Sequence, residues 1–152
     1  MKVEWRWCKF QQLQLLELQA VFALRQQVFI VEQQSIYTDI DGLDAESWHL
    51  LGESENGELL AYARLRGDKK QGCYKFERIV LAPPARGCGA GATLMQQLLD
   101  KAAELAEFPQ LKLSAQSHLQ SFYSKWQFVG EGAEYDDGGI LHRDMQRPLF
   151  SS

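Results

Sequence analysis

Residues 78–92, RIVLAPPARGCGAGA, decide the fold, because they join an apolar run to a helical segment through a glycine-rich turn. The apolar run ends at Pro83-Pro84, and alanines and leucines recur at helical spacing over 89–107. Glycines let the backbone approach a ligand closely, and a helix N-terminus offers unpaired N–H groups and a positive dipole end. The stretch therefore predicts a strand, a turn and a helix that hold a phosphate or pyrophosphate. A tight turn that only packs the strand on the helix is the plainer alternative.

Three strand-like runs lead up to the glycine-rich turn, over 48–53, 59–66 and 74–81. Asn56-Gly57, between the first two, is a strong hairpin signal, so the runs favour an antiparallel meander. The other expected elements are a strand over 5–10, one or two helices over 11–32, a loop over 35–46, a helix over 89–107, a strand over 111–115, a short helix over 117–126 and strands over 128–135 and 140–146. The pattern predicts one α/β domain over 1–152, with a mixed α+β sheet whose antiparallel half precedes one βαβ crossover.

Composition excludes several classes of protein. The chain has 152 residues, of which 45% are hydrophobic and 24% charged, so collagen-like, fibrous and disordered classes are excluded. Lys and Arg number 16 against 20 Asp and Glu, and the net charge of −4 argues against nucleic acid as a partner. The three cysteines are far apart and form no CxxC pair, so a reducing, cytoplasmic location is expected. Apolar runs such as that over 28–31 are too short for a signal peptide or a membrane span.

Three patterns of phosphate-binding loop compete for the glycine-rich turn. The nucleotide P-loop fails, because no Lys-Ser or Lys-Thr pair follows the glycines. Gly87, Gly89 and Ala92 match the dinucleotide pattern G-x-G-x-x-A, but the acidic residue expected ~20 positions later falls near Lys112. The third pattern, R/Q-x-x-G-x-G/A, begins at Arg86 and is met in full.

The third pattern is part of a resemblance to a known family that extends well beyond the glycine-rich turn. Residues 78–91 resemble motif A, and residues 118–128 resemble motif B, of the GNAT superfamily of acyl-CoA-dependent N-acyltransferases. The features similar to its ElaA-type branch are residues 24–33, 37–44 and 115–120, His142 and Met145. The match covers nearly the whole chain in the right order. It implies the GNAT fold and an N-acetyltransferase that moves an acetyl group from acetyl-CoA to a primary amine by direct attack in a ternary complex.

The resemblance also implies where acetyl-CoA binds. Backbone groups at the end of the strand over 74–81 pair with the pantetheine arm, and backbone amides of the glycine-rich turn bind the pyrophosphate. Gln116 ends the next strand and faces the cleft. The implied binding residues are Ile79, Val80 and Leu81 for pantetheine, and Arg86, Gly87, Cys88, Gly89, Ala90, Gly91 and Ala92 for the pyrophosphate.

Catalysis is expected to need an acid and a base. Tyr123 resembles the family tyrosine that protonates the leaving thiolate; the alternative is an aromatic that only packs. An alkylammonium of pKa ~10.4 is about one part in 10³ neutral at pH 7, so attack needs a proton acceptor. The candidate bases are Glu77, just before motif A, and Glu32, at the end of the N-terminal helical region. The alternative for Glu77 is an ion pair with Arg64 or Arg66 on the neighbouring strand.

The loop over 35–46 is rich in carboxylates. Asp39 and Asp41 have two competing interpretations, which are attraction of the cationic amine and a hydrated loop with capping side chains. A calcium site is excluded, because Leu43 and Leu50 would occupy ligand positions of an EF-hand that begins at Asp39. The three histidines lack the spacing of a metal site, so no metal is expected.

One position departs from motif B. Gln127 stands where the family usually has a glycine before the final phenylalanine. A side chain on a left-handed residue costs about 1 kcal/mol, so either the turn differs or the strain is tolerated.

The acceptor amine is left open by the sequence. A small-molecule or peptide amine is expected as partner, without nucleic acid or membrane, in a monomer or homodimer. The main alternative function is a catalytically silent module that binds and senses acyl-CoA. A nucleotide-binding α/β protein is the second alternative, and binding of CoA without NAD or ATP would exclude it.

Overall fold

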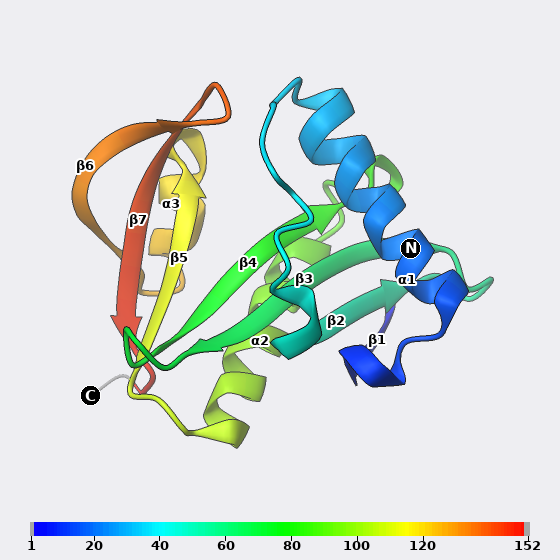
Figure 1. Cartoon of the computed structure of the whole chain (residues 1–152), viewed down its shortest axis with the longest axis horizontal. Coiled ribbons are helices and arrows are strands. Elements are labelled where there is room, and N and C mark those ends of the chain that lie inside the picture. Colours follow the sequence, from blue (N-terminus) through cyan, green and yellow to red (C-terminus); the bar gives the residue numbers. More distant parts are fainter. Residues whose placement is uncertain (1, 151–152) are drawn as a thin grey trace.

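Seven strands form one mixed sheet in the computed structural model, which describes residues 2–150 (Figure 1). The strands are β1 (Glu4–Lys9), β2 (Trp48–Glu53), β3 (Leu59–Asp68), β4 (Cys73–Leu81), β5 (Gln110–Gln116), β6 (Val129–Asp137) and β7 (Ile140–Pro148). Their order across the sheet is β1-β2-β3-β4-β5-β7-β6. Neighbours β4 and β5 pair in parallel, whereas the other neighbours pair antiparallel. The expected antiparallel half and the βαβ crossover after it are confirmed.

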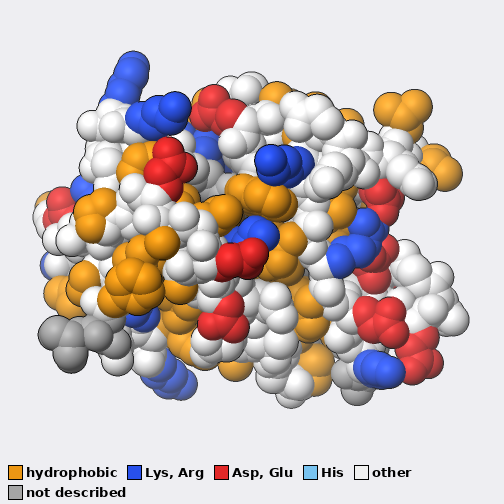
Figure 2. Space-filling view, turned by 90° about the horizontal axis from the view of Figure 1, so that it is seen from below, with side chains coloured by type: hydrophobic (Ala, Val, Ile, Leu, Met, Phe, Trp, Pro, Cys, Tyr) orange, Lys and Arg blue, Asp and Glu red, His pale blue; other side chains and the backbone are white. Residues whose placement is uncertain are grey.

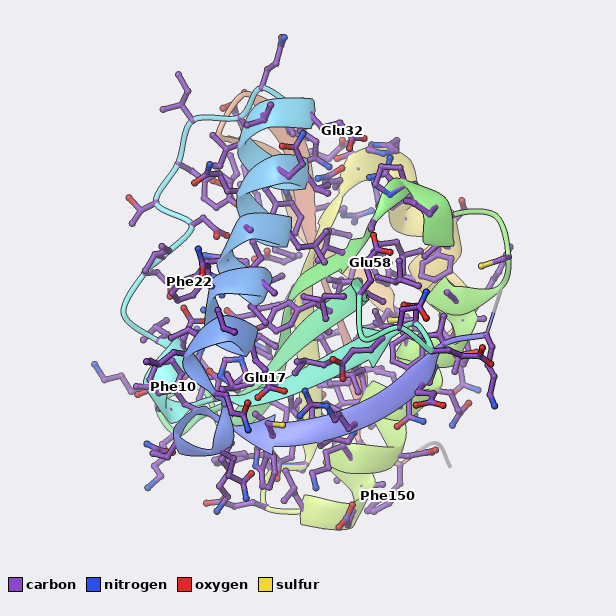
Figure 3. The ribbon with its side chains drawn as sticks, turned by 90° about the vertical axis from the view of Figure 1, so that its right-hand side faces the viewer. Phe10, Glu17, Phe22, Glu32, Glu58 and Phe150 are labelled. Atoms are coloured by element: carbon purple, nitrogen blue, oxygen red, sulfur yellow. The ribbon has the colours of Figure 1, made fainter. Side chains whose placement is uncertain are left out.

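Helices cover both faces of this sheet. The helical elements are η1 (Phe10–Gln12), α1 (Leu15–Arg25), the π-helical η2 (Gln26–Glu32), η3 (Asp44–Glu46), η4 (Pro83–Ala85), α2 (Ala90–Leu105), η5 (Ser117–Leu119) and α3 (Gln120–Ser124). Figure 3 shows α1 on one side of the sheet and α2, the crossover helix, on the other. The glycine-rich turn lies between β4 and α2, as residues 78–92 predict.

Two apolar clusters fix the helices against the strands. The cluster under α1 consists of Val21, Val28, Leu51, Tyr62 and Val80. On the other face, Leu94, Met95 and Leu98 of α2 are fully buried in a larger cluster that includes Leu111 and Leu113 of β5. Because successive side chains of a strand point to opposite faces, the central strands supply both clusters at once.

Strands β4 and β5 diverge in their second halves. Their parallel register stops at the pair Phe76 and Leu113, although both strands continue. The pairing of β4 with β3 shifts register next to Arg78, which has a φ of 55°, so β4 carries a bulge where the divergence begins. The sheet therefore opens between residues 77–81 of β4 and 114–116 of β5 (Figure 1). This opening positions the site described below.

Two of the expected helical segments differ from those observed. The helix expected over 11–32 begins at Leu15, and its last part, 26–32, is π-helical, which apolar spacing alone does not reveal. The short helix expected over 117–126 is a 3-10 turn followed by five α-helical residues, 120–124. Gln127 has a φ of 69°, so the turn keeps the left-handed form and tolerates the strain of a side chain there.

The surface carries charges of both signs. Figure 2 shows one face, on which acidic and basic side chains are interspersed among apolar ones. This distribution accompanies the net charge of −4. Within residues 2–150, no helix has the length and apolar composition needed to cross a membrane.

Candidate active site

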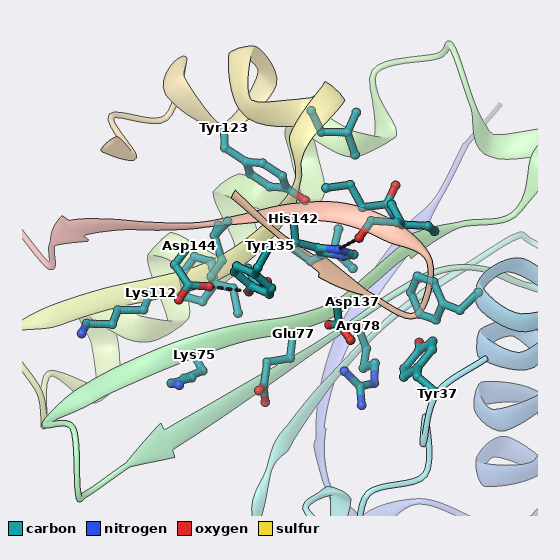
Figure 4. A pocket seen from close by; sticks show the side chains of 18 of the residues that line it. Tyr37, Lys75, Glu77, Arg78, Lys112, Tyr123, Tyr135, Asp137, His142 and Asp144 are labelled. Carbon is teal, nitrogen blue, oxygen red and sulfur yellow. Dashed lines mark hydrogen bonds between the residues drawn. The ribbon is translucent and has the colours of Figure 1, made fainter. Parts of the chain in front are cut away.

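A cavity of about 550 Å³ occupies the opening between β4 and β5. Its walls come from the second half of β4, the end of β5, the β6–β7 hairpin, α3 and the segment after α1 (Figure 4). Of the expected site residues, the cavity brings together Glu77, Ile79, Gln116 and Tyr123. A cavity at the point where parallel strands separate is a usual place for a ligand in an α/β sheet.

Tyr123 reaches the cavity from α3. Its ring packs edge-on against Phe122 and Phe128, with ring centroids 5.1 Å and 6.5 Å away. The side chain is 7% exposed, and burial raises the pKa of its hydroxyl to about 12. The phenol therefore stays protonated at neutral pH, and Figure 4 shows it directed into the cavity. A protonated hydroxyl in this place is suited to give a proton to a leaving group.

Within residues 2–150, the edge of β4 that faces β5 has no partner strand beyond Phe76. Ile79 lines the cavity, whereas the side chain of Val80 is buried in the cluster under α1. Leu81 packs near Gly91, where α2 begins. Backbone groups of residues 77–81 are thus open to an extended ligand, which could add to this edge as a short strand does.

Glu77 is held by two arginines. Its Oε1 accepts hydrogen bonds from Arg64 Nη2 at 3.0 Å and Arg66 Nε at 2.9 Å. Burial disfavours the carboxylate, but the hydrogen bond from Arg66 and the charge of Arg64 outweigh it and lower the pKa of Glu77 below its ordinary value. The ion-pair alternative is therefore the arrangement observed, and the carboxylate is a weaker base than an unpaired glutamate.

Asp39 and Asp41 take part in ion pairs with arginines and do not line the cavity. Asp39 Oδ2 lies 3.0 Å from Arg25 Nε, and Asp39 Oδ1 lies 2.8 Å from Arg78 Nε. Asp41 binds Arg64 through two hydrogen bonds of 2.9 Å. Burial disfavours the charge of Asp41, but the hydrogen bonds from Arg64 lower its pKa well below the ordinary range. Both carboxylates have cationic partners within the protein, so their charge is already compensated.

Asp44 joins these pairs into one buried network. Its Oδ1 accepts hydrogen bonds from Arg25 Nη1 at 2.8 Å and Arg64 Nη1 at 3.0 Å, and both arginines are fully buried. The backbone oxygen of Asp44 also accepts a hydrogen bond from His49 Nε2 at 2.8 Å. The sequence did not predict this buried network, because buried arginines are rare and no local sequence pattern indicates them.

The glycine-rich turn lies outside the cavity, at the N-terminus of α2. Gly87 and Gly89 have φ values of 77° and 84°, which favour glycine, and Gly89 is the N-cap residue of the helix. A side chain at either position would meet no atom within 4 Å. Cys88 is exposed, and its Sγ donates to the Ala85 backbone oxygen at 3.0 Å. The turn presents open backbone N–H groups to solvent, as a phosphate site needs.

Glu32 and Arg86 connect this turn to the N-terminal helical region. Their carboxylate and guanidinium form two hydrogen bonds of 2.7 Å and 3.0 Å. The hydrogen bond from Arg86 lowers the pKa of Glu32. Glu32 does not line the cavity described above; instead it holds the arginine with which the turn begins.

Two hydrogen bonds join the segment after η2 to β5 and to the β6–β7 turn. Gln116 at the end of β5 donates to Gln33 after η2, with 3.0 Å between side-chain atoms. Ser35 donates to the backbone oxygen of Gly138 in the β6–β7 turn at 2.7 Å. The segment after α1 therefore closes one end of the cavity.

Sequence reasoning missed the polar wall formed by the β6–β7 hairpin. The Tyr135 hydroxyl donates to Asp144 Oδ1 at 2.6 Å and accepts a hydrogen bond from Ser114 Oγ. His142 Nδ1 lies 2.8 Å from the backbone oxygen of Ile140. The available signal was the period-2 alternation of the last two strands, which puts Tyr135, His142 and Asp144 on one face. Among residues 2–150, no group of three or more metal-ligating side chains is placed to hold a metal ion.

Comparison with known proteins gives consistent matches over the whole length. The family model described as an acetyltransferase (GNAT) domain matches residues 13–149. A UPF0039 protein of Synechocystis sp. is 40% identical over 95% of each chain, and the protein ElaA of Escherichia coli is 34% identical over 99% of each. Among solved structures, an acyl-CoA N-acyltransferase from Pseudomonas aeruginosa superposes with a TM-score of 0.90 at 37% identity, covering 96% of this chain and 99% of that one. The crystal structure of E. coli ElaA gives 0.89 at 32% identity, with the same coverage.

Proposed function

Because the chain belongs to the GNAT acetyltransferase family, in its ElaA-type branch, we propose that it transfers the acetyl group of acetyl-CoA to a primary amine. The observation that carries the proposal is the unpaired edge of β4, which faces a cavity that also contains the protonated Tyr123. The acceptor in this proposal is a small-molecule or peptide amine. Transfer occurs by direct attack, and holding both substrates in one cavity supplies much of the rate enhancement.

Acetyl-CoA binding in this proposal uses two adjacent features of the chain. Backbone N–H groups of residues 87–92 bind the pyrophosphate at the N-terminus of α2, where the helix dipole favours negative charge. The N–H of Arg86, with which the turn begins, is donated to the backbone oxygen of Pro83. The pantetheine arm then runs along residues 79–81 of β4. This stretch of strand extends from the turn to the cavity, which Ile79 lines. A backbone N–H of this edge polarises the thioester carbonyl and stabilises the negative oxygen that develops during attack. Gln116, at the end of β5, lines the side of the cavity opposite β4.

Tyr123 is the acid in this proposal. Attack of the amine on the carbonyl carbon expels a CoA thiolate, which leaves more readily when it receives a proton. The raised pKa of Tyr123 guarantees that the proton is present at neutral pH. Because the ring is held by Phe122 and Phe128, the hydroxyl has a defined direction when the thioester arrives.

The acceptor amine is assigned to the β6–β7 side of the cavity rather than to the loop over 35–46. Asp39 and Asp41 are already bound to arginines, so a cationic amine would have to displace Arg25, Arg64 or Arg78. This ion pairing supports placing the amine away from these two carboxylates. Asp137 and Asp144 line the cavity on the β6–β7 hairpin.

A cytoplasmic location is part of the same proposal. Cys8, Cys73 and Cys88 are all unpaired thiols. Unpaired cysteines fit a compartment in which thiols remain reduced.

The proposal is tested by mixing the purified protein with acetyl-CoA and a panel of primary amines that includes n-butylamine, spermidine and an amino-acid ester. Release of the CoA thiol, followed with a thiol reagent, reports transfer, and mass spectrometry identifies the acetylated amine. We expect at least one amine to be acetylated well above the rate without protein. Binding of acetyl-CoA without transfer to any amine would contradict the proposal and support the silent acyl-CoA-binding module instead.

A further inference from the structure

One imidazole in the cavity has its tautomer fixed by a backbone hydrogen bond. His142 Nδ1 lies 2.8 Å from the backbone oxygen of Ile140. A carbonyl oxygen only accepts hydrogen bonds, so Nδ1 carries the proton and donates it. In the neutral ring, Nε2 therefore holds a free lone pair. The ring lines the cavity, and Nε2 makes no hydrogen bond with any residue that the structure describes.

The ring is also held in place from the neighbouring strands. Tyr135 stacks on it, with ring centroids 6.2 Å apart and an interplanar angle of 24°. Tyr135 is fixed in turn by its hydrogen bonds to Asp144 and Ser114 (Figure 4). Across the other edge of β7, His142 pairs in register with Gln116 of β5. Rotation of the imidazole would break the bond to Ile140 and the stacking together, so Nε2 keeps one direction.

We propose that His142 is the general base of the reaction and that its Nε2 removes a proton from the ammonium group of the acceptor. The inference rests on the proposed function and deepens it, because that function left the base unassigned. The two carboxylates that the sequence favours are both held by arginines, Glu77 by Arg64 and Arg66 and Glu32 by Arg86. His142 is a titratable group of the same cavity whose basic nitrogen is unoccupied.

The acceptor R–NH3+ gives one proton to Nε2, and His142 becomes an imidazolium. The free electron pair of the nitrogen attacks the thioester carbon, so a C–N bond forms and the C–S bond breaks. Sulfur takes the electron pair of the broken bond and the proton of Tyr123. The new amide nitrogen loses its second proton to the tyrosinate, and the imidazolium later releases one proton to water.

Several charged groups share the cavity with His142, which becomes a positively charged imidazolium during the step. The other charged or titratable groups that line the cavity are Tyr37 from the segment after η2, Lys75, Glu77 and Arg78 from β4, Lys112 from β5, Tyr123 from α3, Glu131, Tyr135 and Asp137 from β6, and Asp144 from β7. Asp137 and Asp144 of the hairpin line the same cavity as the imidazolium that forms in this step. Arg78 opposes it less than a free arginine would, because Asp39 and Asp41 compensate its charge.

The test compares His142→Asn with His142→Phe. The asparagine amide keeps a donor for the Ile140 oxygen but offers no base, whereas phenylalanine keeps the stacking on Tyr135 and loses both nitrogens. His118→Asn is the matched control, because His118 is exposed on η5 and does not line the cavity. Each variant is assayed with acetyl-CoA and two nucleophiles, which are the best amine of the panel and hydroxylamine, the second being largely neutral at pH 7. Calorimetry measures the acetyl-CoA affinity of each variant.

We expect His142→Asn and His142→Phe to lower kcat/KM for the alkylamine by about 10²–10⁴-fold at unchanged acetyl-CoA affinity. The loss with hydroxylamine is expected to stay below about tenfold, because this nucleophile has no ammonium proton to remove. The rise of kcat/KM with pH that imidazole deprotonation produces should vanish in both variants. His118→Asn should behave as the unmodified protein.

The outcomes separate the inference from the proposed function. An unmodified protein that acetylates no amine overturns the proposed function, and the role of His142 falls with it. An active protein whose His142→Asn variant keeps its alkylamine rate and its pH profile overturns the role of His142 alone. An equal loss with both nucleophiles points to a purely structural side chain and also overturns it. A two-bond ¹H–¹⁵N NMR spectrum gives a check without turnover, because a proton on Nε2 of neutral His142 would refute the assigned tautomer.

Discussion

Replacing Asp44 by asparagine should markedly lower the free energy of unfolding, because this carboxylate lies between two buried guanidinium groups. Asp44 is 4% exposed and accepts hydrogen bonds of 2.8 Å from Arg25 and 3.0 Å from Arg64. Hydrogen bonds to charged groups contribute about 1.5–3 kcal/mol each. Asparagine keeps one acceptor oxygen but removes the negative charge, and breaking a buried ion pair costs about 3–5 kcal/mol. Since both arginines retain a second carboxylate, we expect Asp44→Asn to lower the free energy of unfolding by about 3 kcal/mol.

The assay is urea and thermal unfolding followed by circular dichroism at pH 7. For a chain of this size a loss of about 3 kcal/mol lowers Tm by about 6–12 °C. Asp100→Asn is the matched control, because Asp100 is exposed on α2 and, among the described residues, its side chain accepts a hydrogen bond only from Gln96. A surface substitution of that kind is expected to stay within about 0.5 kcal/mol. Equal stabilities of the two variants would refute the assigned role of the network.

The same network predicts a dependence on pH. Burial disfavours the charge of Asp44, but the hydrogen bond and charge of Arg25 lower its pKa in the folded protein. A carboxylate with a lowered pKa contributes stability at pH values above its unfolded pKa, near ~4, and loses that contribution as pH falls through the folded pKa. The gap in stability between the unmodified protein and Asp44→Asn should therefore be full at pH 6–8 and should shrink below about pH 4. A gap that grows on acidification would contradict this sign.

Three further outcomes are expected. Tyr123→Phe should lower kcat by about 10²-fold and leave the calorimetric Kd for acetyl-CoA unchanged, because it removes only a proton donor. Glu77→Gln should lower the urea midpoint, since Arg64 and Arg66 lose a charged acceptor, yet keep the pH profile of the reaction; loss of that profile would restore Glu77 as the base. The free energy of unfolding of Gln127→Gly should exceed that of Gln127→Ala by about 1 kcal/mol, because the residue has a φ of 69°, which glycine adopts without the strain of a Cβ.

The sequence predicts the architecture well because its local signals agree with one another. Residues 78–92 indicate the crossover, Asn56-Gly57 marks a hairpin, and the strand over 48–53 has the expected bounds in the structure. Such features depend on residues close together in the chain. The ion pair of Glu77 with Arg64 and Arg66 could also be foreseen, because adjacent strands bring those side chains together.

The polar arrangement of the cavity could not be predicted in the same way. Arg25 meets Asp39 and Asp44 only after α1 and the loop over 35–46 dock on the sheet, and nothing local in the sequence indicates that contact. The carboxylates of that loop were therefore open to an interpretation as amine ligands. His142 acquires its fixed tautomer from the backbone of Ile140, which depends on the conformation of the β6–β7 hairpin rather than on residue type.

The most direct test of the account is a calorimetric titration of acetyl-CoA into the unmodified protein, Gly89→Glu and Gly89→Ala. Both variants add a Cβ to a residue with a φ of 84°, so they carry the same backbone strain, and that Cβ would meet no atom of the described residues within 4 Å beyond its chain neighbours. Only glutamate repels the pyrophosphate at the N-terminus of α2. The account predicts binding in the micromolar range for the unmodified protein, similar binding for Gly89→Ala and none for Gly89→Glu. No binding by the unmodified protein, or equal binding by the two variants, would contradict the assignment of acetyl-CoA to this turn.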